Sequence, residues 1–187
     1  SWSVESIVSV GDFPVRASWA PSSGRVYVSN RDGNVIRPVR RLQSGFTVLG
    51  PIAVGDSPYE SRVSPDGSTL YVIEYGDDAL GVVDLVAGTK TATIPIGETI
   101  VGMELVADGS SVVLATGGYT ATVGGGVFEI TDSGELVVVD SATNSVAQTV
   151  NNDWSPAGLV GDPSAGFDDF DRAVDQLGGF ARGLGAA

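Results

Sequence analysis

Acidic residues occupy matching positions in three glycine-containing turns, where Asp12, Asp56 and Glu98 each follow a glycine. Asp77 and Asp78 lie together in another turn. Carboxylate oxygens are the ligands that Ca²⁺ and Mg²⁺ prefer, so these five side chains are the candidate metal ligands of the sequence. The alternative is that Asp suits turns for a local reason, because its side chain accepts hydrogen bonds from nearby backbone N–H groups.

Histidine and cysteine are both absent from the 187 residues. Zinc sites of the usual ligand set, haem attachment, cysteine nucleophiles and histidine-based triads are therefore excluded. We expect no organic cofactor and no tightly bound transition metal, because such metals prefer imidazole and thiolate ligands. Ca²⁺ or a similar hard cation is the remaining candidate, and acid–base chemistry would need Asp, Glu, Tyr or metal-bound water.

The formal net charge is −13, from 23 acidic and 10 basic side chains. Such a surface repels phosphate backbones, so we expect no nucleic-acid partner. Divalent cations, cationic proteins or a high-salt environment suit this charge better, although acidity also serves solubility. No apolar run reaches the roughly 20 residues that a membrane-spanning helix needs, so we expect no membrane span.

Arginines gather in one segment, at Arg37, Arg40 and Arg41. On a strand, Arg37 and Arg41 would share a face while Arg40 points the other way. We interpret this cluster, together with Tyr75, as a contact for another protein whose surface is acidic. The alternative is a solvated edge strand, in which the charges and Pro38 prevent pairing with other chains.

A glycine-rich stretch at 117–126 supplies two more candidate partner contacts, Gly124 and Gly125. It is not a phosphate loop, because no Gly-x-Gly-x-x-Gly motif lies between a strand and a helix. We interpret it as a hairpin or contact arm. The three tryptophans are interpreted as core or sheet-interface residues, and they are Trp2, Trp19 and Trp154.

The acidic turns belong to an internal repeat. Their glycines stand at positions 11, 55 and 97, which are 44 and 42 residues apart. A second glycine turn follows each at a nearly constant distance, at positions 24, 67 and 109. Two landmarks at a fixed offset indicate a repeated structural unit.

Runs rich in β-branched and aromatic residues follow the second turns and predict strands. The predicted strands cover residues 25–30, 69–74, 80–84, 91–96, 111–116, 135–140 and 146–150. Four strands in each period of about 40 to 45 residues make the unit of a β-propeller blade. In the second strands we expect burial of the inward-facing members of Tyr27, Val28, Tyr71, Val72, Val113 and Leu114.

The second copy carries Val54-Gly55 with Pro58, then Pro65-Asp66-Gly67, Leu70-Tyr71-Val72, Val82-Val83-Asp84 and Ile94. This pattern resembles the YVTN family of β-propeller repeats, which includes surface-layer and lactonase-like propellers. The resemblance extends over about residues 4–166. It implies an all-β fold of propeller blades with four antiparallel strands each, and it says little about activity because propellers host many functions.

We divide the chain into a repeat domain, residues 1–166, and an acidic, helical and Gly-rich tail, residues 167–187. Blade repeats start near residues 11, 55, 97 and 153, which gives about three full blades and partial ones. Residues 6–10 are predicted to be the outer strand of a preceding blade. In the first copy, residues 35–41 replace the usual third-strand sequence, and Pro38 suits only an edge or a bulge.

Three blades leave two terminal faces to cover, because each blade buries its faces against neighbours and closed propellers have about four to eight blades. We therefore expect the chain to work in an oligomer or a larger assembly, with other subunits or copies of itself as partners. The sequence begins at Ser1 without an initiator Met, as it would after removal of an export signal or trimming of a longer chain.

The leading hypothesis is a non-catalytic module for protein binding or self-assembly, located outside the cytoplasm, secreted or at the cell surface. The alternative is a lactonase-like or Ca²⁺/Mg²⁺-assisted hydrolase, in which the acidic loops hold an ion that polarises a carbonyl. The absence of His and Cys argues against the enzyme, since the usual base and nucleophile are missing.

Overall fold

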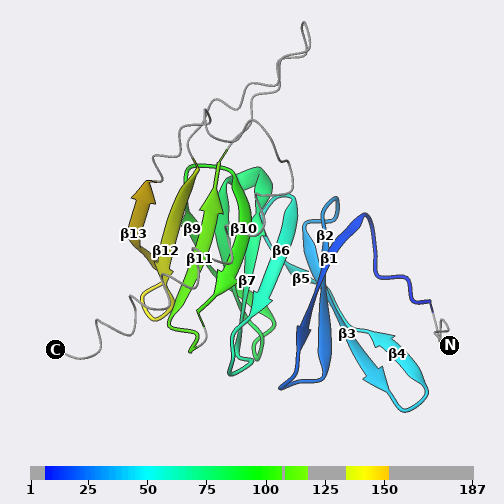
Figure 1. Cartoon of the computed structure of the whole chain (residues 1–187). Helices are drawn as coiled ribbons and strands as arrows, with labels where there is room; N and C mark the ends of the chain where they lie inside the picture. Colours follow the sequence, from blue (N-terminus) through cyan, green and yellow to red (C-terminus); the bar gives the residue numbers. More distant parts are fainter. Residues whose placement is uncertain (1–6, 107, 118–133, 152–187) are drawn as a thin grey trace, which may run out of the picture. The chain divides into compact units, whose positions relative to one another are not determined.

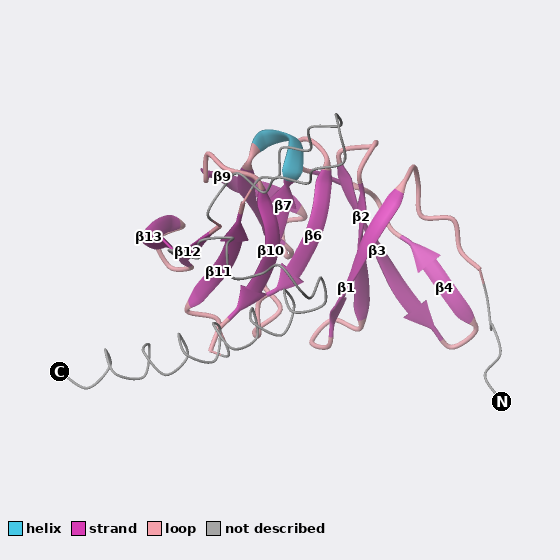
Figure 2. Ribbon diagram, turned by 45° about the horizontal axis from the view of Figure 1, so that its top comes forward, coloured by secondary structure: helices cyan, strands magenta, loops and turns pink. Residues whose placement is uncertain are grey.

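The computed structural model describes residues 7–106, 108–117 and 134–151. Regular structure in these residues is β-strand apart from one turn of 3₁₀ helix, η1 (Tyr75–Asp77), drawn in cyan in Figure 2. The strands form three antiparallel sheets in chain order (Figure 1). The expected all-β architecture of four-stranded blades is confirmed. No helix of the described residues is long and apolar enough to cross a membrane.

Several predictions fall outside the described residues. They concern Trp2, Trp154, the two glycines 124 and 125, the repeat starting near 153 and the tail 167–187. The chain divides into two compact units, residues 1–103 and 104–187, with the boundary inside strand β10. The first and second sheets both lie in the first unit.

The first sheet has the strand order β1-β2-β3-β4, and the short β5 also pairs with β3. Its strands are β1 (Pro14–Ala20), β2 (Arg25–Asn30), β3 (Val35–Leu42), β4 (Gly45–Val48) and β5 (Ile52–Ala53). β4 pairs with the end of β3 and β5 with its beginning. The two short strands therefore act as one fourth strand that is interrupted between Val48 and Ile52.

Pro38 lies inside β3, opposite Tyr27 of β2. Its carbonyl accepts a hydrogen bond from the Leu49 N–H, at 2.9 Å. The carbonyl and the backbone nitrogen of a strand residue point to the same side. The ring nitrogen of Pro38, which carries no hydrogen, therefore also faces the fourth strand. That strand is interrupted next to Leu49, so Pro38 sits at an irregularity, as its chemistry requires.

Residues 7–10 form no strand. The prediction of an outer strand at 6–10 is therefore wrong for the residues that are described. An extended segment becomes a strand only when a neighbour supplies hydrogen bonds. The outer strand of a preceding blade would pair with the third strand of that blade, and the described residues contain no strand before β1.

The second and third sheets repeat the four-stranded order, β6-β7-β8-β9 and β10-β11-β12-β13. The second contains β6 (Pro58–Val63), β7 (Thr69–Glu74), β8 (Ala79–Asp84) and β9 (Thr89–Pro95). The third contains β10 (Ile100–Leu105), β11 (Ser111–Thr116), β12 (Glu135–Asp140) and β13 (Ser145–Asn151). The predicted strands are all present, with ends that shift by a residue or two.

The first and second sheets share an apolar core in which one face of each sheet meets the other. Ala20, Tyr27, Ile36 and Ile52, here named the A face of the first sheet, are buried in one cluster with residues of β7 and β8. Those residues of the second sheet are Leu70, Val72 and Val83, with Leu85 just beyond β8. The six second-strand residues expected to be buried all have 9% exposure or less.

Trp19 is an exception to the expected core, because its side chain is 55% exposed. It pairs with Val26 across β1 and β2, one residue out of step with the pair Ser18 and Tyr27. Alternate residues of a strand point to opposite faces, so Trp19 lies on the side of the first sheet that faces away from the second. Of the two interpretations given for Trp19, the core residue is therefore wrong for this chain, and the sheet-interface residue stays a prediction.

Candidate functional site

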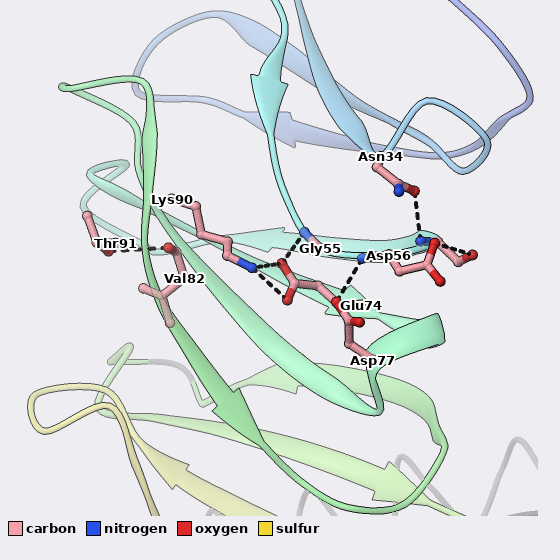
Figure 3. Close-up of polar contacts among 9 residues, drawn as sticks. Asn34, Gly55, Asp56, Glu74, Asp77, Val82, Lys90 and Thr91 are labelled. Carbon is pink, nitrogen blue, oxygen red and sulfur yellow. Dashed lines mark hydrogen bonds and ion pairs between the residues drawn. The ribbon is translucent and has the colours of Figure 1, made fainter.

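The end of β7 holds a buried ion pair, shown in Figure 3. Glu74 has no solvent exposure, and the Lys90 Nζ lies 2.9 Å and 3.0 Å from its two carboxylate oxygens. The Gly55 N–H donates to Glu74 Oε1 at 2.6 Å. A buried carboxylate is costly unless it is paired and hydrogen-bonded, and this carboxylate has three donor contacts, from β9 and from the turn before β6.

Two glycines leave the space that the carboxylate occupies. A Cβ added to Gly55 would lie 2.4 Å from Glu74 Oε2, and one added to Gly81 would lie 2.3 Å from Glu74 Oε1. Both separations are shorter than any real contact, and the carboxylate cannot swing away without losing Lys90. A side chain at 81 would therefore displace Glu74, and one at 55 would displace both Glu74 and Asp77.

A buried polar side chain ends the second strand of every sheet. Asn30, Glu74 and Thr116 are 0%, 0% and 3% exposed, and they stand 44 and 42 residues apart. In the first sheet the space beside Asn30 is bordered by Gly11 and by the Nε of Arg37. The same strand end is thus next to Arg37 in the first sheet and to Lys90 in the second.

Two further side chains link one turn to the next, and we call each link a clasp. Asn34, in the turn before β3, accepts a hydrogen bond from the Ser57 N–H at 3.0 Å (Figure 3). Asp78, in the matching turn before β8, accepts one from the Thr99 hydroxyl at 3.3 Å. Asn34 and Asp78 both have left-handed backbone angles, with φ of 52° and 46°, which Asn and Asp tolerate better than most residues.

Several Asp side chains bind their own turns. The Asp66 carboxylate accepts from the Ser64 and Ser68 hydroxyls and the Ser68 N–H. The Ser64 hydroxyl is the largest cause that lowers the pKa of Asp66, from 3.8 to about 2. The Ser110 and Thr143 side chains are likewise the largest causes that lower the pKa of Asp108 and of Asp140.

The five candidate metal ligands are spread over four turns, with Asp77 and Asp78 in the same one. Asp56 and Asp77 do meet, since the Asp56 N–H donates to Asp77 Oδ2 at 2.8 Å, and Asp78 is used in its clasp. Within the described part of the chain, no three acidic side chains gather in a way that could hold a metal ion. Asp12 and Glu98 are exposed in their own turns, and a calcium site remains a prediction.

The basic cluster divides between the two faces of β3, as expected. Arg40 pairs with Arg25 of β2, whereas Arg41 pairs with Phe46 of β4. Like charges placed directly opposite each other destabilise a sheet. Among the described residues neither Arg25 nor Arg40 has an ion-pair partner, and the Nε of Arg25 is buried without a hydrogen bond.

Apolar side chains accompany these arginines on the β3–β4 hairpin. Leu42 and Phe46 are 42% and 39% exposed. Arginine beside an exposed aromatic ring is a composition that protein interfaces favour. The hairpin therefore joins a cationic and an apolar surface in a chain whose net charge is −13.

Tyr75 lies in a second exposed cluster that bridges the first two sheets. Its ring centroid is 6.3 Å from that of Tyr59. The Arg16 guanidinium lies 5.1 Å from the Tyr59 ring centroid and donates to the Tyr59 hydroxyl at 3.2 Å. The Tyr59 ring, backed by Tyr75, thus holds an exposed arginine in place between β1 and β6.

Sequence reasoning missed the ion pair and the clasps. Lys90 is the only lysine of the chain and Glu74 replaces the Asn found at the end of β2. These two features of the sequence could have indicated the ion pair. Asn34 and Asp78 are 44 residues apart, which marks them as repeat equivalents, although nothing in the sequence shows what they bind.

No protein-family model and no curated protein sequence matches the chain. Among solved structures, hydrazine synthase of Kuenenia stuttgartiensis is similar with a TM-score of 0.64 and 22% identity, over 79% of this chain and 38% of that one. Dihydro-heme d1 dehydrogenase NirN in complex with DHE is similar with a TM-score of 0.53 and 18% identity, over 74% of this chain and 28% of that one.

The chain spans well under half the length of either of these two proteins. Identities this low show likeness of fold and nothing about activity. Together with the three four-stranded antiparallel sheets, they show that the chain has a fold of the β-propeller type.

Proposed function

We propose that this chain is a non-catalytic propeller module that binds an acidic protein surface through the β3–β4 hairpin. The observation that carries the proposal is the direct pairing of Arg25 with Arg40. This pair costs stability, it has no carboxylate partner among the described residues, and the chain has 23 acidic side chains that could have supplied one. An acidic partner would supply the missing charges.

The finer parts of the proposal rest on the sequence. The YVTN-type repeat pattern supports membership of that group of propellers, whose surface-layer members support a location outside the cytoplasm or at the cell surface. Partners are other protein subunits or further copies of this chain. Arg37, Arg41 and Tyr75 are proposed as additional contacts, and Tyr75 would act with Arg16 and Tyr59.

Replacing Arg40 by Glu should abolish binding of an acidic partner without lowering the stability of the fold. Arg40→Glu places a carboxylate opposite Arg25, so the urea midpoint should stay the same or rise. Binding of acidic peptides selected on the native chain from a random-peptide phage library should be lost. Arg31→Glu, which makes the same change in net charge elsewhere, should keep that binding.

Two results would contradict this function. One is a selection on the native chain that yields no acidic peptides, and the other is equal binding by the Arg40→Glu variant. Sedimentation velocity at increasing concentration identifies the case in which the bound surface belongs to another copy of the chain, because the Arg40→Glu change would then also abolish self-association.

The second candidate is a lactonase-like or metal-assisted hydrolase, and the hydrogen bond from the Asp56 N–H to Asp77 Oδ2, which joins two acidic turns, is the observation nearest to it. Two carboxylates supply fewer ligands than Ca²⁺ takes from a protein site. The proposal of a binding module therefore predicts no lactone hydrolysis above background with Ca²⁺ or Mg²⁺ present. Hydrolysis that is lost in both Asp56→Asn and chelator-treated protein would establish the enzyme instead.

A further inference from the structure

One face of the first sheet is partly exposed, whereas its counterpart in the second sheet is buried. On this face of the first sheet Val28 and Val39 are themselves buried. The 44-residue repeat matches Ala17 with Ser61, Trp19 with Val63, and Val26 with Leu70. In the second sheet Ser61 is 2% exposed, Leu70 is fully buried and Val63 packs against the core cluster. In the first sheet Ala17 is exposed, Trp19 is 55% exposed and Val26 is half-buried. We name Ala17, Trp19 and Val26 the B face of the first sheet.

What covers this type of face is visible in the first unit itself. The A face of the first sheet packs on the counterpart of the B face in the second sheet, through Tyr27 and Ile36 on one side and Leu70 and Val72 on the other. The strands β1 and β6 are neighbours in this contact (Figure 1). The repeat therefore contains one example of the contact that the B face lacks.

The clasps recur with the same period and identify a second open position. Asn34 accepts a hydrogen bond from the Ser57 N–H, and Asp78 accepts one from the Thr99 hydroxyl. The residue of the first copy that is equivalent to Ser57 and Thr99 is Phe13. Phe13 and Ser57 have nearly the same left-handed φ, 49° and 52°. Their carbonyls accept matching hydrogen bonds, from the Arg31 N–H at 3.1 Å and the Tyr75 N–H at 3.2 Å.

The turn at Phe13 is thus built like the turn that receives a clasp. Among the described residues, no side chain caps the Phe13 N–H. The side chain of Phe13 is 56% exposed, with Arg31 lying 5.7 Å from the ring centroid. The open B face and the open clasp position are close in the chain, because β1 carries Trp19 and begins at the residue that follows Phe13.

We infer that the B face of the first sheet is the docking surface for a preceding propeller blade of the same repeat type. That blade presents an apolar A face to Trp19 and Val26. It carries Asn or Asp, with left-handed backbone angles, immediately before its third strand, and this side chain caps the Phe13 N–H. The proposal concerns a different surface from the Arg25–Arg40 pair and stands without it.

The clasp also argues against the third sheet of a second copy as the occupant. Asn34 and Asp78 each directly precede the third strand of their sheet, and the residue in that place before β12 is Gly134. Glycine has no side chain with which to cap a backbone donor. The occupant is therefore a blade with the sequence features of the first two.

A tandem duplication tests the inference on the full chain. A copy of residues 11–54 inserted between residues 10 and 11 places a blade with its own A face and Asn34 in front of the original first sheet. Because the chain has no cysteine, a single Ala17→Cys change in the original sheet reports exposure of the B face by its rate of alkylation. Val86→Cys, at a site that is 88% exposed, is the matched control.

The inference predicts that the thiol introduced by Ala17→Cys reacts rapidly in the native-length chain. In the duplicated chain it should react more slowly, by about tenfold or more, because alkylation then requires local opening. The control thiol introduced by Val86→Cys should react equally in both chains. Changing Asn34 to Ala in the inserted copy should restore part of the reactivity at position 17. Rapid alkylation at that position in a duplicated chain that is folded by circular dichroism would overturn the inference.

Two further results keep the test decisive. Protection of the thiol at position 17 that grows with the concentration of the native-length chain would mean that a second copy is the occupant, contrary to the inference. Should the duplicated chain not fold, the comparison of Trp19→Ser with Val63→Ser in the native-length chain remains. An open B face predicts a lower urea midpoint for Val63→Ser and an unchanged one for Trp19→Ser, and equal losses would show that the B face is already covered.

Discussion

Single side chains in this protein hold turns and strand ends in place, and Glu74 is the most constrained of them. Lys90 and the Gly55 N–H satisfy a carboxylate that has no solvent exposure. Removing one partner of a buried pair leaves a charge in a medium of low polarity, which costs much more than losing a pair at the surface.

Lys90→Met should therefore lower the free energy of unfolding by about 3 kcal/mol near neutral pH, since it leaves the Glu74 carboxylate buried with one donor. Urea unfolding followed by Trp fluorescence measures the change. Arg62→Met removes the more exposed partner of Glu60 and should cost below about 1 kcal/mol. Equal losses in the two variants would contradict this account of the buried pair.

Asp66 makes stability depend on pH in a predictable direction. Its folded pKa, about 2, lies below the ordinary value of 3.8 because the Ser64 hydroxyl and the Ser68 hydroxyl and N–H stabilise the carboxylate. A depressed folded pKa gives stability that is present above pH 3.8 and is lost as the pH falls toward 2. Because Asp66 is exposed, screening by water keeps the contribution below about 1 kcal/mol.

The variant Asp66→Asn should accordingly be less stable than the native chain at pH 5, and the difference should shrink as the pH is lowered toward 2. Urea midpoints at several pH values measure it. A difference that stays constant over this range would show that the carboxylate does not act through its charge. An NMR titration of Ser64→Ala should find a higher pKa for Asp66 than in the native chain.

At the scale of the strands, the room for the Glu74 carboxylate between β7 and β8 depends on glycine. Gly81 lies opposite Val72 in the register of β7 and β8, and a Cβ at this position would meet the Glu74 carboxylate at 2.3 Å. The carboxylate is held by Lys90 from β9. Residues of β7, β8 and β9 therefore constrain the position of the Glu74 carboxylate together.

Gly81→Ala should lower the free energy of unfolding by about 1 to 3 kcal/mol, the usual cost of overpacking a core. In a Glu74→Ala background the same change should cost less, because the atoms that clash are gone. A double-mutant cycle in urea measures this coupling. Equal costs in both backgrounds would mean that Gly81 is required for another reason.

At the scale of the whole molecule, the net charge of −13 is spread over a chain whose carboxylates serve many separate turns. Mutual repulsion of these charges destabilises the folded state, and salt screens it. A specific calcium site would add to this effect, whereas plain acidity would not.

Raising NaCl from about 10 mM to 500 mM, where the Debye length falls from about 30 Å to a few Å, should raise the thermal midpoint. Ca²⁺ at equal ionic strength should raise it no further if the acidic turns act only as backbone caps. A larger, saturable increase with Ca²⁺ that Asp56→Asn removes would establish the metal site predicted from the sequence.

The sequence alone determined the repeat and its strands, because β-branched runs between glycine turns have few other stable arrangements. The strands 25–30, 69–74 and 111–116 match β2, β7 and β11 for this reason. The same local chemistry determined that Asp66 and Asp140 cap their own turns, since both partners lie within three residues.

Only the tertiary structure decided which distant groups meet. Lys90 is 16 residues from Glu74, and Asn34 is 23 residues from Ser57, so their contacts depend on strand register and on the packing of one sheet against the next. Trp19 shows the same limit, since its size predicted burial while its position in β1 points it away from the second sheet. The acidic turns repeat in the sequence, yet the structure uses their carboxylates differently, because Asp56 accepts from Ser57 within its own turn whereas Asp77 and Asp78 accept from residues 21 positions away.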